Sequence, residues 1–255
     1  MNTTNESMKH QNICVVVPTY NNGGTIVDVL QRILLVTDQV ILVIDGCTDN
    51  TREQLRLLGD TPIDIVDYEQ NRGKGHAIVA GFRRAIELGY DYAITLDSDG
   101  QHFPEDIPLF VTALEQHPDA LIVGSRNLEQ ENMSGGSLFA NKFSNFWFTV
   151  QTWLPLPDTQ TGFRLYPLHQ LSGTRWITSR YEAELELLVF SAWKGVEIVA
   201  LPIRVYYPPQ SERVTHFRPL PDFGRISVLN TVLCFVAVFY GWPRMLLRKL
   251  FHKKK

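Results

Sequence analysis

Two aspartates one residue apart, Asp97 and Asp99, end the apolar run 92–97. Neighbouring carboxylates repel each other, so this arrangement costs free energy unless a positive group lies between them. Mg²⁺ and Mn²⁺ prefer hard oxygen ligands and often take only one or two from a protein, with phosphate oxygens completing the set. The pair therefore predicts a divalent-cation site, to which Gln101 could add an amide oxygen. The alternative is a turn whose aspartate caps the next helix.

Two other segments carry groups suited to a phosphorylated ligand. Lys74 lies between two glycines in the stretch NRGKGHAI, just before a predicted helix. Backbone N–H groups at a helix start can face an anion, and the lysine adds a point charge. The spacing is not that of a P-loop. Asp45 could accept hydrogen bonds from a base or ribose, while Thr48 or Asp49 caps the following helix.

The elements that must position these residues are visible in the first half of the chain. Apolar, β-branched runs of strand length occur at 13–18, 39–45, 62–68, 92–97 and 120–125, with helical patterns between them. This alternation predicts an α/β fold with a parallel sheet. Because ligands bind beyond the carboxyl ends of such strands, the polar loops after these runs should share one site.

The pattern changes after residue 126. The aromatic-rich segment up to 167 suggests a flexible loop, a helix and an irregular polar turn. A second helix is predicted over 181–195, and a strand pair or one long bent strand over 196–208.

Composition narrows the class of protein. The chain has 255 residues, 44% of them hydrophobic, and a net charge of −3, which suggests no polyanionic partner such as nucleic acid. Its three cysteines suit a reducing compartment. The polar N-terminus, residues 1–11, lacks the apolar core of a signal peptide and is expected to be disordered. We therefore expect a cytosolic body; association into an oligomer stays open.

Several segments occur in the order seen in family 2 glycosyltransferases: VVVPTYNN, VIDGCTDNT, NRGKGHAI, LDSDGQHFPED, VGSR, DTQTGFRLY and YEAELELL. They look most like the dolichyl-phosphate mannosyltransferase branch, which transfers sugars to polyprenyl phosphates. The resemblance spans roughly residues 12 to 215. It implies the GT-A fold (a Rossmann-like, nucleotide-binding, mostly parallel sheet flanked by helices), a nucleotide-sugar donor, a divalent metal (Mg²⁺ or Mn²⁺) and inversion at the anomeric centre.

The resemblance also implies roles for single residues. The nucleotide pocket would be formed by Pro18, Tyr20, Asn22, Asp45, Lys74, Asp97 and Ser98, with Asp45 on the base. The metal and diphosphate would be surrounded by Asp97, Asp99 and Gln101. The catalytic set would be Asp99, Arg126, Arg164, Glu184 and Arg213, the arginines serving the donor and acceptor phosphates.

The chain departs from the family pattern at a few positions. Asn22 stands where the family usually has Glu, and Ile44 where it has a second Asp. Both changes remove charge from the nucleotide pocket, so a GDP-sugar and a UDP-sugar both stay open, as does a catalytically inert nucleotide-sugar-binding module. Where the polyprenyl-phosphate enzymes carry a spaced Arg and a Ser-Lys, this chain has Arg213 and Thr215-His216.

Whether the enzyme needs a general base depends on the class of acceptor. A lipid phosphate is already an anion at neutral pH and needs none, whereas a hydroxyl of a lipid or glycan does. Glu182 and Glu184, at the start of the helix 181–195, are the candidate bases. Their alternative is a solvated helix face with good helix propensity.

The C-terminal segment predicts contact with a membrane. Residues 226–242 carry no charge and are slightly short of the ~20 residues that span a bilayer. Their polar members Ser227, Asn230, Thr231 and Cys234 fall on one helical stripe. After Pro243, leucines and a phenylalanine alternate with Lys and Arg, a pattern typical of a helix on an anionic membrane.

Topology favours an interfacial or re-entrant pair of helices, because a single span would carry the lysine tail to the far side, against the positive-inside tendency. A core or dimer helix is the alternative. We expect a disordered segment 1–11, a GT-A domain 12–218 and membrane-associating helices with a basic tail at 219–255. The whole predicts an enzyme on the cytoplasmic membrane face, moving a sugar from a nucleotide donor to a lipid, above all to a polyprenyl phosphate.

Overall fold

A computed structural model describes residues 3–127, 135–171, 178–207 and 219–252, with the backbone alone at 135–137, 219–223 and 252. The predicted strand–helix alternation is present in the first half of the chain. Its elements are α1 (Thr3–His10), β1 (Ile13–Thr19), α2 (Ile26–Leu34), β2 (Val40–Asp45), α3 (Thr51–Leu55), β3 (Ile63–Tyr68), α4 (Lys74–Glu87), β4 (Tyr92–Thr95), α5 (Ile107–Gln116) and β5 (Leu121–Arg126). The second half contains α6 (Gly135–Thr152), β6 (Arg164–Pro167), α7 (Leu168–Leu171), α8 (Glu182–Lys194), β7 (Ile198–Ile203), α9 (Pro219–Val236) and α10 (Trp242–His252).

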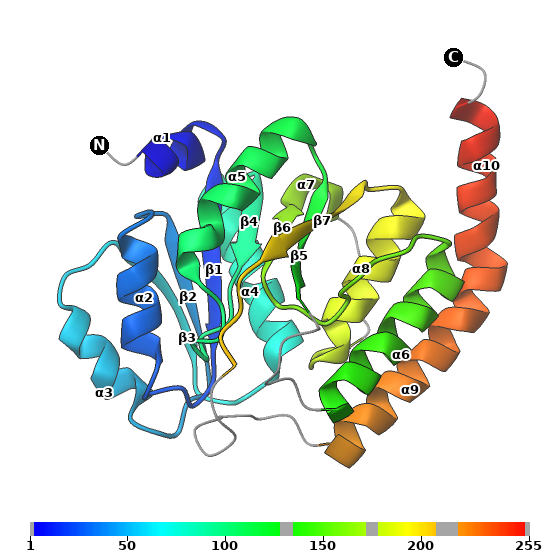
Figure 1. Ribbon diagram of the computed structural model, residues 1–255. Coiled ribbons are helices and arrows are strands. Elements are labelled where there is room, and N and C mark those ends of the chain that lie inside the picture. Colours follow the sequence, from blue (N-terminus) through cyan, green and yellow to red (C-terminus); the bar gives the residue numbers. More distant parts are fainter. Residues whose placement is uncertain (1–2, 128–134, 172–177, 208–218, 253–255) are drawn as a thin grey trace.

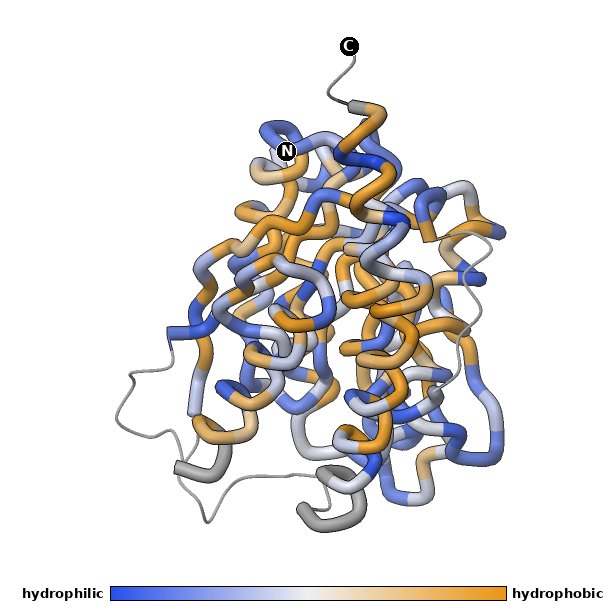
Figure 2. Tube along the Cα trace, turned by 90° about the vertical axis from the view of Figure 1, so that its right-hand side faces the viewer, coloured by the Kyte–Doolittle hydropathy of each residue, from blue (hydrophilic) through white to orange (hydrophobic). Residues whose placement is uncertain are grey.

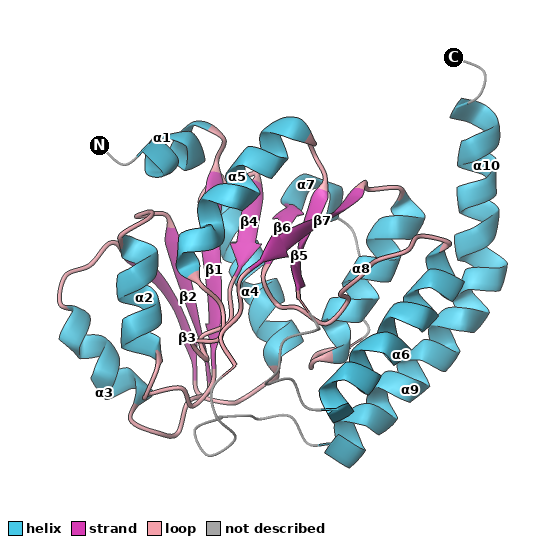
Figure 3. Cartoon of the chain, viewed as in Figure 1, coloured by secondary structure: helices cyan, strands magenta, loops and turns pink. Residues whose placement is uncertain are grey.

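A seven-stranded sheet in the order β3-β2-β1-β4-β6-β5-β7 crosses the molecule (Figures 1 and 3). Its neighbouring strands are parallel except where β6 pairs with β4 and β5. The first five strands therefore all end at one edge, the lower edge in Figure 1, which we call the catalytic edge. The predicted parallel α/β sheet is confirmed.

Strand β6 is the one element of the sheet that the sequence did not predict. Residues 164–167 were expected in an irregular polar turn, but they form a central strand, with Leu165 opposite both Ile94 and Ile122. A strand of four residues that ends in proline has almost no local signal, because its hydrogen-bond partners come from β4 and β5. Beyond β7, Val205 bridges to His102, which fits the long bent strand expected there.

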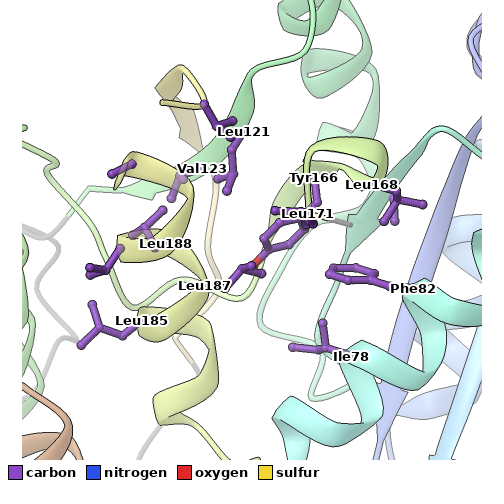
Figure 4. Packing of buried hydrophobic residues seen from close by; sticks show 14 of the residues in the cluster. Ile78, Phe82, Leu121, Val123, Tyr166, Leu168, Leu171, Leu185, Leu187 and Leu188 are labelled. Carbon is purple, nitrogen blue, oxygen red and sulfur yellow. The ribbon is translucent and has the colours of Figure 1, made fainter. Parts of the chain in front are cut away.

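The sheet separates two hydrophobic cores. Alternate residues of β1 point to opposite faces of the sheet. Val15 and Val17 enter the core between the sheet and helices α2 and α5. Cys14 and Val16 enter the core between the sheet and helices α4 and α8. Figure 4 shows the second core, where Phe82 of α4 meets Tyr166 of β6 and leucines of α8. Both faces are covered, which explains why the central strands are apolar throughout.

The N-terminal segment differs from the expected disorder. Residues Thr3–His10 form α1, in which Met8 is fully buried. The side chain of Asn5 accepts hydrogen bonds from Thr37 Oγ1 and from the N–H of Asp38. A buried methionine and satisfied loop hydrogen bonds are sufficient to order a short polar segment against the body.

The C-terminal segment is one continuous helical rod instead of a re-entrant pair. A π-helical turn at Ala237–Gly241 joins α9 to α10 without a reversal (Figure 1). The turn comes just before Pro243, which cannot donate a backbone hydrogen bond, and a π turn accommodates such a gap without breaking the helix. The rod begins near the catalytic edge and ends at the opposite end of the molecule.

The inner side of the rod is mixed, with Asn230 buried beside the apolar Leu229 and Leu233, whereas Thr231 of the polar stripe is exposed. Gln151 of α6 donates to Asn230 Oδ1 at 3.0 Å and lies 3.7 Å from Cys234 Sγ, while Trp193 Nε1 donates to the Gln151 carbonyl at 2.8 Å. The exposed large apolar residues of the rod, which we call the outer apolar face, are Val228, Val232, Phe235, Val238, Phe239, Leu246, Leu247, Leu250 and Phe251. Figure 2 views this side and shows the hydrophobic colour of the rod. In a water-soluble protein a helix normally keeps so many large apolar side chains away from water.

Among the described residues, Gly224–Phe251 is the one helix long and apolar enough to cross a bilayer by length and composition.

Candidate active site

The catalytic edge brings together side chains from three separate parts of the chain. Asp97 follows β4, Lys74 begins α4, and Glu184 lies in the first turn of α8. Lys74 Nζ lies 2.9 Å from Asp97 Oδ1, 3.0 Å from Asp97 Oδ2 and 2.9 Å from Glu184 Oε2. One ammonium group is therefore shared by two carboxylates, both well shielded from solvent.

Two glycines explain how Lys74 reaches this position. Gly73 has φ +97°, and a Cβ there would lie 2.6 Å from the Ser179 carbonyl oxygen. A Cβ on Gly75 would lie 2.3 Å from the Cβ of Ala183 in α8. The start of α4 can approach the start of α8 this closely only because neither residue has a side chain. The glycines of NRGKG thus allow α4 and α8 to pack closely, and this packing places Lys74 beside Asp97 and Glu184.

Asp99 lies beside this group and has no ion-pair partner among the residues that the structure describes. Burial and the neighbouring charge of Asp97 raise the pKa of Asp99 to about 6. Burial also opposes ionisation of Asp97, but the Lys74 ammonium outweighs it and holds the Asp97 pKa below its usual value. Burial by itself would lower the pKa of Lys74, but the charges of Asp97 and Glu184 outweigh it and raise that pKa. The site therefore has uncompensated negative charge at Asp99.

These residues fit a divalent cation of the Mg²⁺ or Mn²⁺ type. No group of three or more His, Cys, Asp or Glu side chains that could enclose a metal occurs among the described residues. The catalytic edge instead offers two carboxylates, Asp97 and Asp99, with excess negative charge. Gln101 belongs to the same turn, since its N–H donates to Asp99 Oδ1 at 3.0 Å. Such an open oxygen site suits a metal that takes its other ligands from a diphosphate and water.

Asp45 lies at the end of β2, as predicted, but its carboxylate faces the chain's own backbone. It accepts hydrogen bonds from the N–H groups of Arg72 (2.7 Å) and Gly73 (2.9 Å) and from Asn71 Nδ2 (3.1 Å). The N–H groups before α4, which we expected to face a ligand anion, thus face Asp45. Contact between Asp45 and a base stays a prediction; the structure shows it fixing the loop that carries Lys74.

Ser98 connects the first loop of the site to the metal loop. It is buried, donates to the Pro18 carbonyl at 3.0 Å and accepts from Asn22 Nδ2 at 2.8 Å. Thr25 Oγ1 donates to the Ser98 carbonyl at 2.6 Å. Pro18, Asn22 and Ser98, predicted to bind the nucleotide, are therefore adjacent. Tyr20 lies half-buried in the same loop. Asn22 occupies the family's glutamate position as a hydrogen-bond donor.

Arg126, at the end of β5, is held by a residue that the sequence did not single out. Its guanidinium forms two hydrogen bonds with Asp158, at 2.6 and 3.0 Å, and Asn141 of α6 donates to the same carboxylate at 2.7 Å. Asp158 is fully buried. The only signal for it was its place in the motif DTQTGFRLY. Arg126 retains slight exposure, with 15% of its side chain accessible.

Arg164 lies at the catalytic edge but is fully buried at the start of β6. Its guanidinium donates to the carbonyls of Thr159, Thr161 and Glu184 at 2.8–2.9 Å. These bonds fix the loop before β6 to the first turn of α8. The geometry gives Arg164 a positioning role and no open face for a phosphate.

The remaining predicted residues differ in how they are placed. Glu182 is buried, and its Oε2 has no hydrogen-bond partner among the described residues. Glu182 and Glu184 therefore do not form the solvated helix face that was the alternative. Arg213, Thr215 and His216 lie outside the described residues.

His102 is a further buried group that the sequence analysis left without a role. Its ring centroid lies 5.5 Å from that of Phe163, and its Nδ1 has no partner among the described residues. Burial lowers the pKa of His102 to about 4, so the ring is neutral at pH 7.

Comparisons with known proteins agree with this geometry. A family model described as glycosyl transferase family 2 matches residues 14–177. The UDP-N-acetylglucosamine–dolichyl-phosphate N-acetylglucosaminyltransferase of Methanococcus voltae is 28% identical over 220 residues, covering 78% of this chain and 87% of that protein. The undecaprenyl-phosphate mannosyltransferase of Micrococcus luteus is 27% identical over 201 residues, covering 75% and 82%.

Among solved structures, glucosyl-3-phosphoglycerate synthase from Mycobacterium tuberculosis, in complex with Mn²⁺, UDP and phosphoglyceric acid, has a TM-score of 0.67 at 20% identity. The match covers 92% of this chain and 81% of that chain. At that identity the likeness concerns the fold, and the expected GT-A fold is confirmed. With a family model over most of the sheet and the predicted motifs gathered at its catalytic edge, the chain belongs to glycosyltransferase family 2.

Proposed function

We propose that this enzyme is an inverting, metal-dependent glycosyltransferase that moves a sugar from a nucleoside-diphosphate sugar to a membrane lipid, with a polyprenyl phosphate as acceptor. The donor is a UDP- or GDP-sugar. The enzyme works at the cytoplasmic face of the membrane, where nucleotide sugars are available. The observation that carries the lipid acceptor is the outer apolar face, which begins beside the catalytic edge.

The donor side of the proposal is based on charge. A sugar diphosphate and the carboxylates Asp97 and Asp99 would repel each other, so a divalent cation between them is required on electrostatic grounds. When bound, the metal would supply stabilisation of the negative charge that develops on the departing diphosphate. Asp97, Asp99 and Gln101 would hold it. Lys74 and Arg126 would add fixed positive charge near the phosphates.

The acceptor side is based on the pairing of Glu184. Its carboxylate is held by Lys74, so it is less available to take a proton from a hydroxyl. A lipid phosphate needs no base: its oxygen attacks the anomeric carbon as the bond from that carbon to the diphosphate breaks, and the nucleoside diphosphate leaves. Relatives named for dolichyl-phosphate and undecaprenyl-phosphate acceptors support this class. So does the polyprenol monophosphomannose synthase of Mycolicibacterium smegmatis, 26% identical over 204 residues.

The location at the membrane is based on the outer apolar face of the rod. Its inner side packs on α6 and α8 along α9, and on α8 along α10. If the rod crossed a bilayer with these contacts intact, α6, α8 and the polar body behind them would have to enter the lipid as well. We therefore propose that the rod lies along the membrane surface with the outer apolar face in the lipid. Lys249 over the Trp153 ring and Arg244 over the Tyr240 ring place cations and aromatic residues together, as is common at a membrane interface.

One experiment tests the proposal directly. Membranes that contain the full chain are incubated with a panel of labelled UDP- and GDP-sugars, and the lipid is extracted. We expect label in the lipid fraction that mild acid releases, because a sugar on a polyprenyl monophosphate is acid-labile. A product that resists acid would indicate a hydroxyl acceptor instead. Donor that stays intact with every metal and sugar would indicate an inert binding module.

A further inference from the structure

Neutralising Asp97 with Lys74 does not require Glu184 at the same ammonium. Lys74 contacts both oxygens of Asp97, which is sufficient to balance that charge. Yet Glu184 Oε2 approaches the same ammonium to 2.9 Å, and only 7% of the glutamate is exposed. Burying a second carboxylate costs free energy, and Asp97 already compensates the Lys74 charge, so the position of Glu184 points to a function.

We propose that Glu184 is a positioning residue that draws part of the Lys74 charge away from Asp97 and so keeps the carboxylate pair Asp97 and Asp99 negative enough to bind a divalent cation. The inference deepens the proposed function and rests on its metal dependence. It assigns Glu184 to the metal site through Lys74, in place of the general-base role that the sequence suggested.

The surroundings of Glu184 hold it in this position. Its carbonyl accepts a hydrogen bond from Arg164 Nη1 at 2.8 Å, which fixes the first turn of α8. The Tyr181 ring centroid lies 6.0 Å from Lys74 Nζ and covers the ammonium from the other side. Glu184 Oε1 is buried and has no partner among the described residues, so the carboxylate is committed to Lys74 through Oε2. Besides its two ion-pair partners, the ammonium interacts electrostatically with Asp99 and His102. The Arg164 guanidinium acts on Asp97 and Glu184 in the same way.

Charge arithmetic gives opposite effects for the two members of the pair. Glu184→Gln removes one negative charge from the site and should weaken Mn²⁺ binding by about tenfold, the order expected for a unit charge a few ångströms from a divalent ion. Lys74→Met removes one positive charge and should tighten Mn²⁺ binding. The double variant has the same net charge as the natural site, so its Mn²⁺ dissociation constant should return to within about threefold of the wild-type value.

The experiment is a titration of the full chain with Mn²⁺ alone, followed by electron paramagnetic resonance of the free ion, with no sugar donor present. Glu184→Asp keeps the charge and should retain most of the affinity. Glu197→Gln, the same chemical change at an exposed site, is the matched control and should bind Mn²⁺ like the wild type. Thermal unfolding of every variant shows whether it is folded.

Each outcome decides between roles. If Glu184 merely supports the fold, the double variant will bind Mn²⁺ no better than Glu184→Gln, and the inference is overturned. If Glu184→Gln binds Mn²⁺ like the wild type but has lost sugar transfer, Glu184 acts as a general base and the inference is wrong. If the wild type binds no Mn²⁺, both the inference and the metal dependence of the proposed function are wrong, which distinguishes that failure from the other two.

Discussion

At the residue scale, the site is a set of charges whose balance depends on contacts between distant parts of the chain. Lys74 is shared by Asp97 and Glu184, while Asp99 has no cation among the described residues. Asp45 and Ser98, whose contact with a ligand stays a prediction, hold loops together in this structure. Groups predicted to bind the ligand and groups that hold the site together are adjacent in sequence, so residue type alone does not separate them.

The first prediction concerns Asp99. Asp99→Asn keeps the shape of the side chain but removes the charge that a metal would compensate. We expect the rate of metal-dependent sugar transfer to fall by about 100-fold or more. Stabilisation of the charge on a leaving group by a metal commonly changes the rate by that factor. Transfer from a labelled donor is the measurement, and Asp60→Asn, an exposed aspartate away from the site, is the control. An Asp99→Asn enzyme with normal metal-dependent turnover would refute the proposed function.

A second prediction concerns the buried pair of Arg126 and Asp158. Replacing Asp158 by Ala leaves the guanidinium largely buried and unpaired, and it also removes the acceptor used by Asn141. The free energy of unfolding should fall by about 3 kcal/mol or more. Urea denaturation measures it. Arg126→Met combined with Asp158→Ala should recover part of the loss, because no charge is then left buried; purely additive losses would show that the pair is not coupled.

At the scale of the element, the rod of α9 and α10 is the least ordinary feature. Two members of its predicted polar stripe, Asn230 and Cys234, face Gln151 of α6, whereas Thr231 is exposed. A buried amide between helices fixes the rotation of the rod, because any other rotation leaves Asn230 and Gln151 without partners. That rotation is what exposes the outer apolar face.

The third prediction tests the outer apolar face. The double variant Val232→Gln/Phe239→Gln changes residues with 44% and 81% exposure, so the fold should retain its stability. Binding to vesicles that contain anionic lipid should weaken by about tenfold or more, because burial of each such side chain contributes roughly 1.5–3 kcal/mol. Vesicle co-sedimentation measures it. Leu57→Gln, an equally exposed apolar residue on the other side of the sheet, should bind vesicles like the wild type. Equal binding by all three proteins would contradict the proposed membrane face.

At the scale of the whole molecule, the rod and the body share one core. Leu229, Leu233 and Ala237 are buried in the same cluster as Trp193 and the leucines of α8. A Cβ on Gly241 would lie 2.4 Å from the Trp193 ring, so the rod and α8 are in close contact at the π turn. The division into a domain 12–218 and a separate segment 219–255 stays a proposal, and the packing limits how separable the two parts are.

The fourth prediction follows from this shared core. Removing residues 219–255 should not release a soluble enzyme, because it exposes apolar surface of α6 and α8 to water. We expect a marked loss of thermal stability and aggregation on expression. Thermal unfolding and size-exclusion chromatography of the shortened chain are the measurements. A shortened chain that is monomeric and as stable as the full chain would show that the rod is a removable anchor.

The sequence by itself determined the parallel α/β sheet and the edge at which the polar loops meet. Strand period, helix period and glycine-rich turns are local properties, and parallel strands necessarily end together, so Asp97, Asp99 and Lys74 could be assigned to one site in advance. It also determined that the tail is apolar with a polar stripe, since that is a matter of helical spacing.

Only the tertiary structure decided which way each of these features faces. β6 was not predictable, because its four residues become a strand through the backbone of β4 and β5. The partner of Lys74 in α8 and the partner of Arg126 at Asp158 lie 110 and 32 positions away along the chain, and no local pattern encodes such distances. The same holds for the rod: periodicity gives a polar stripe, but the contact between Asn230 and Gln151 determines which apolar residues are exposed.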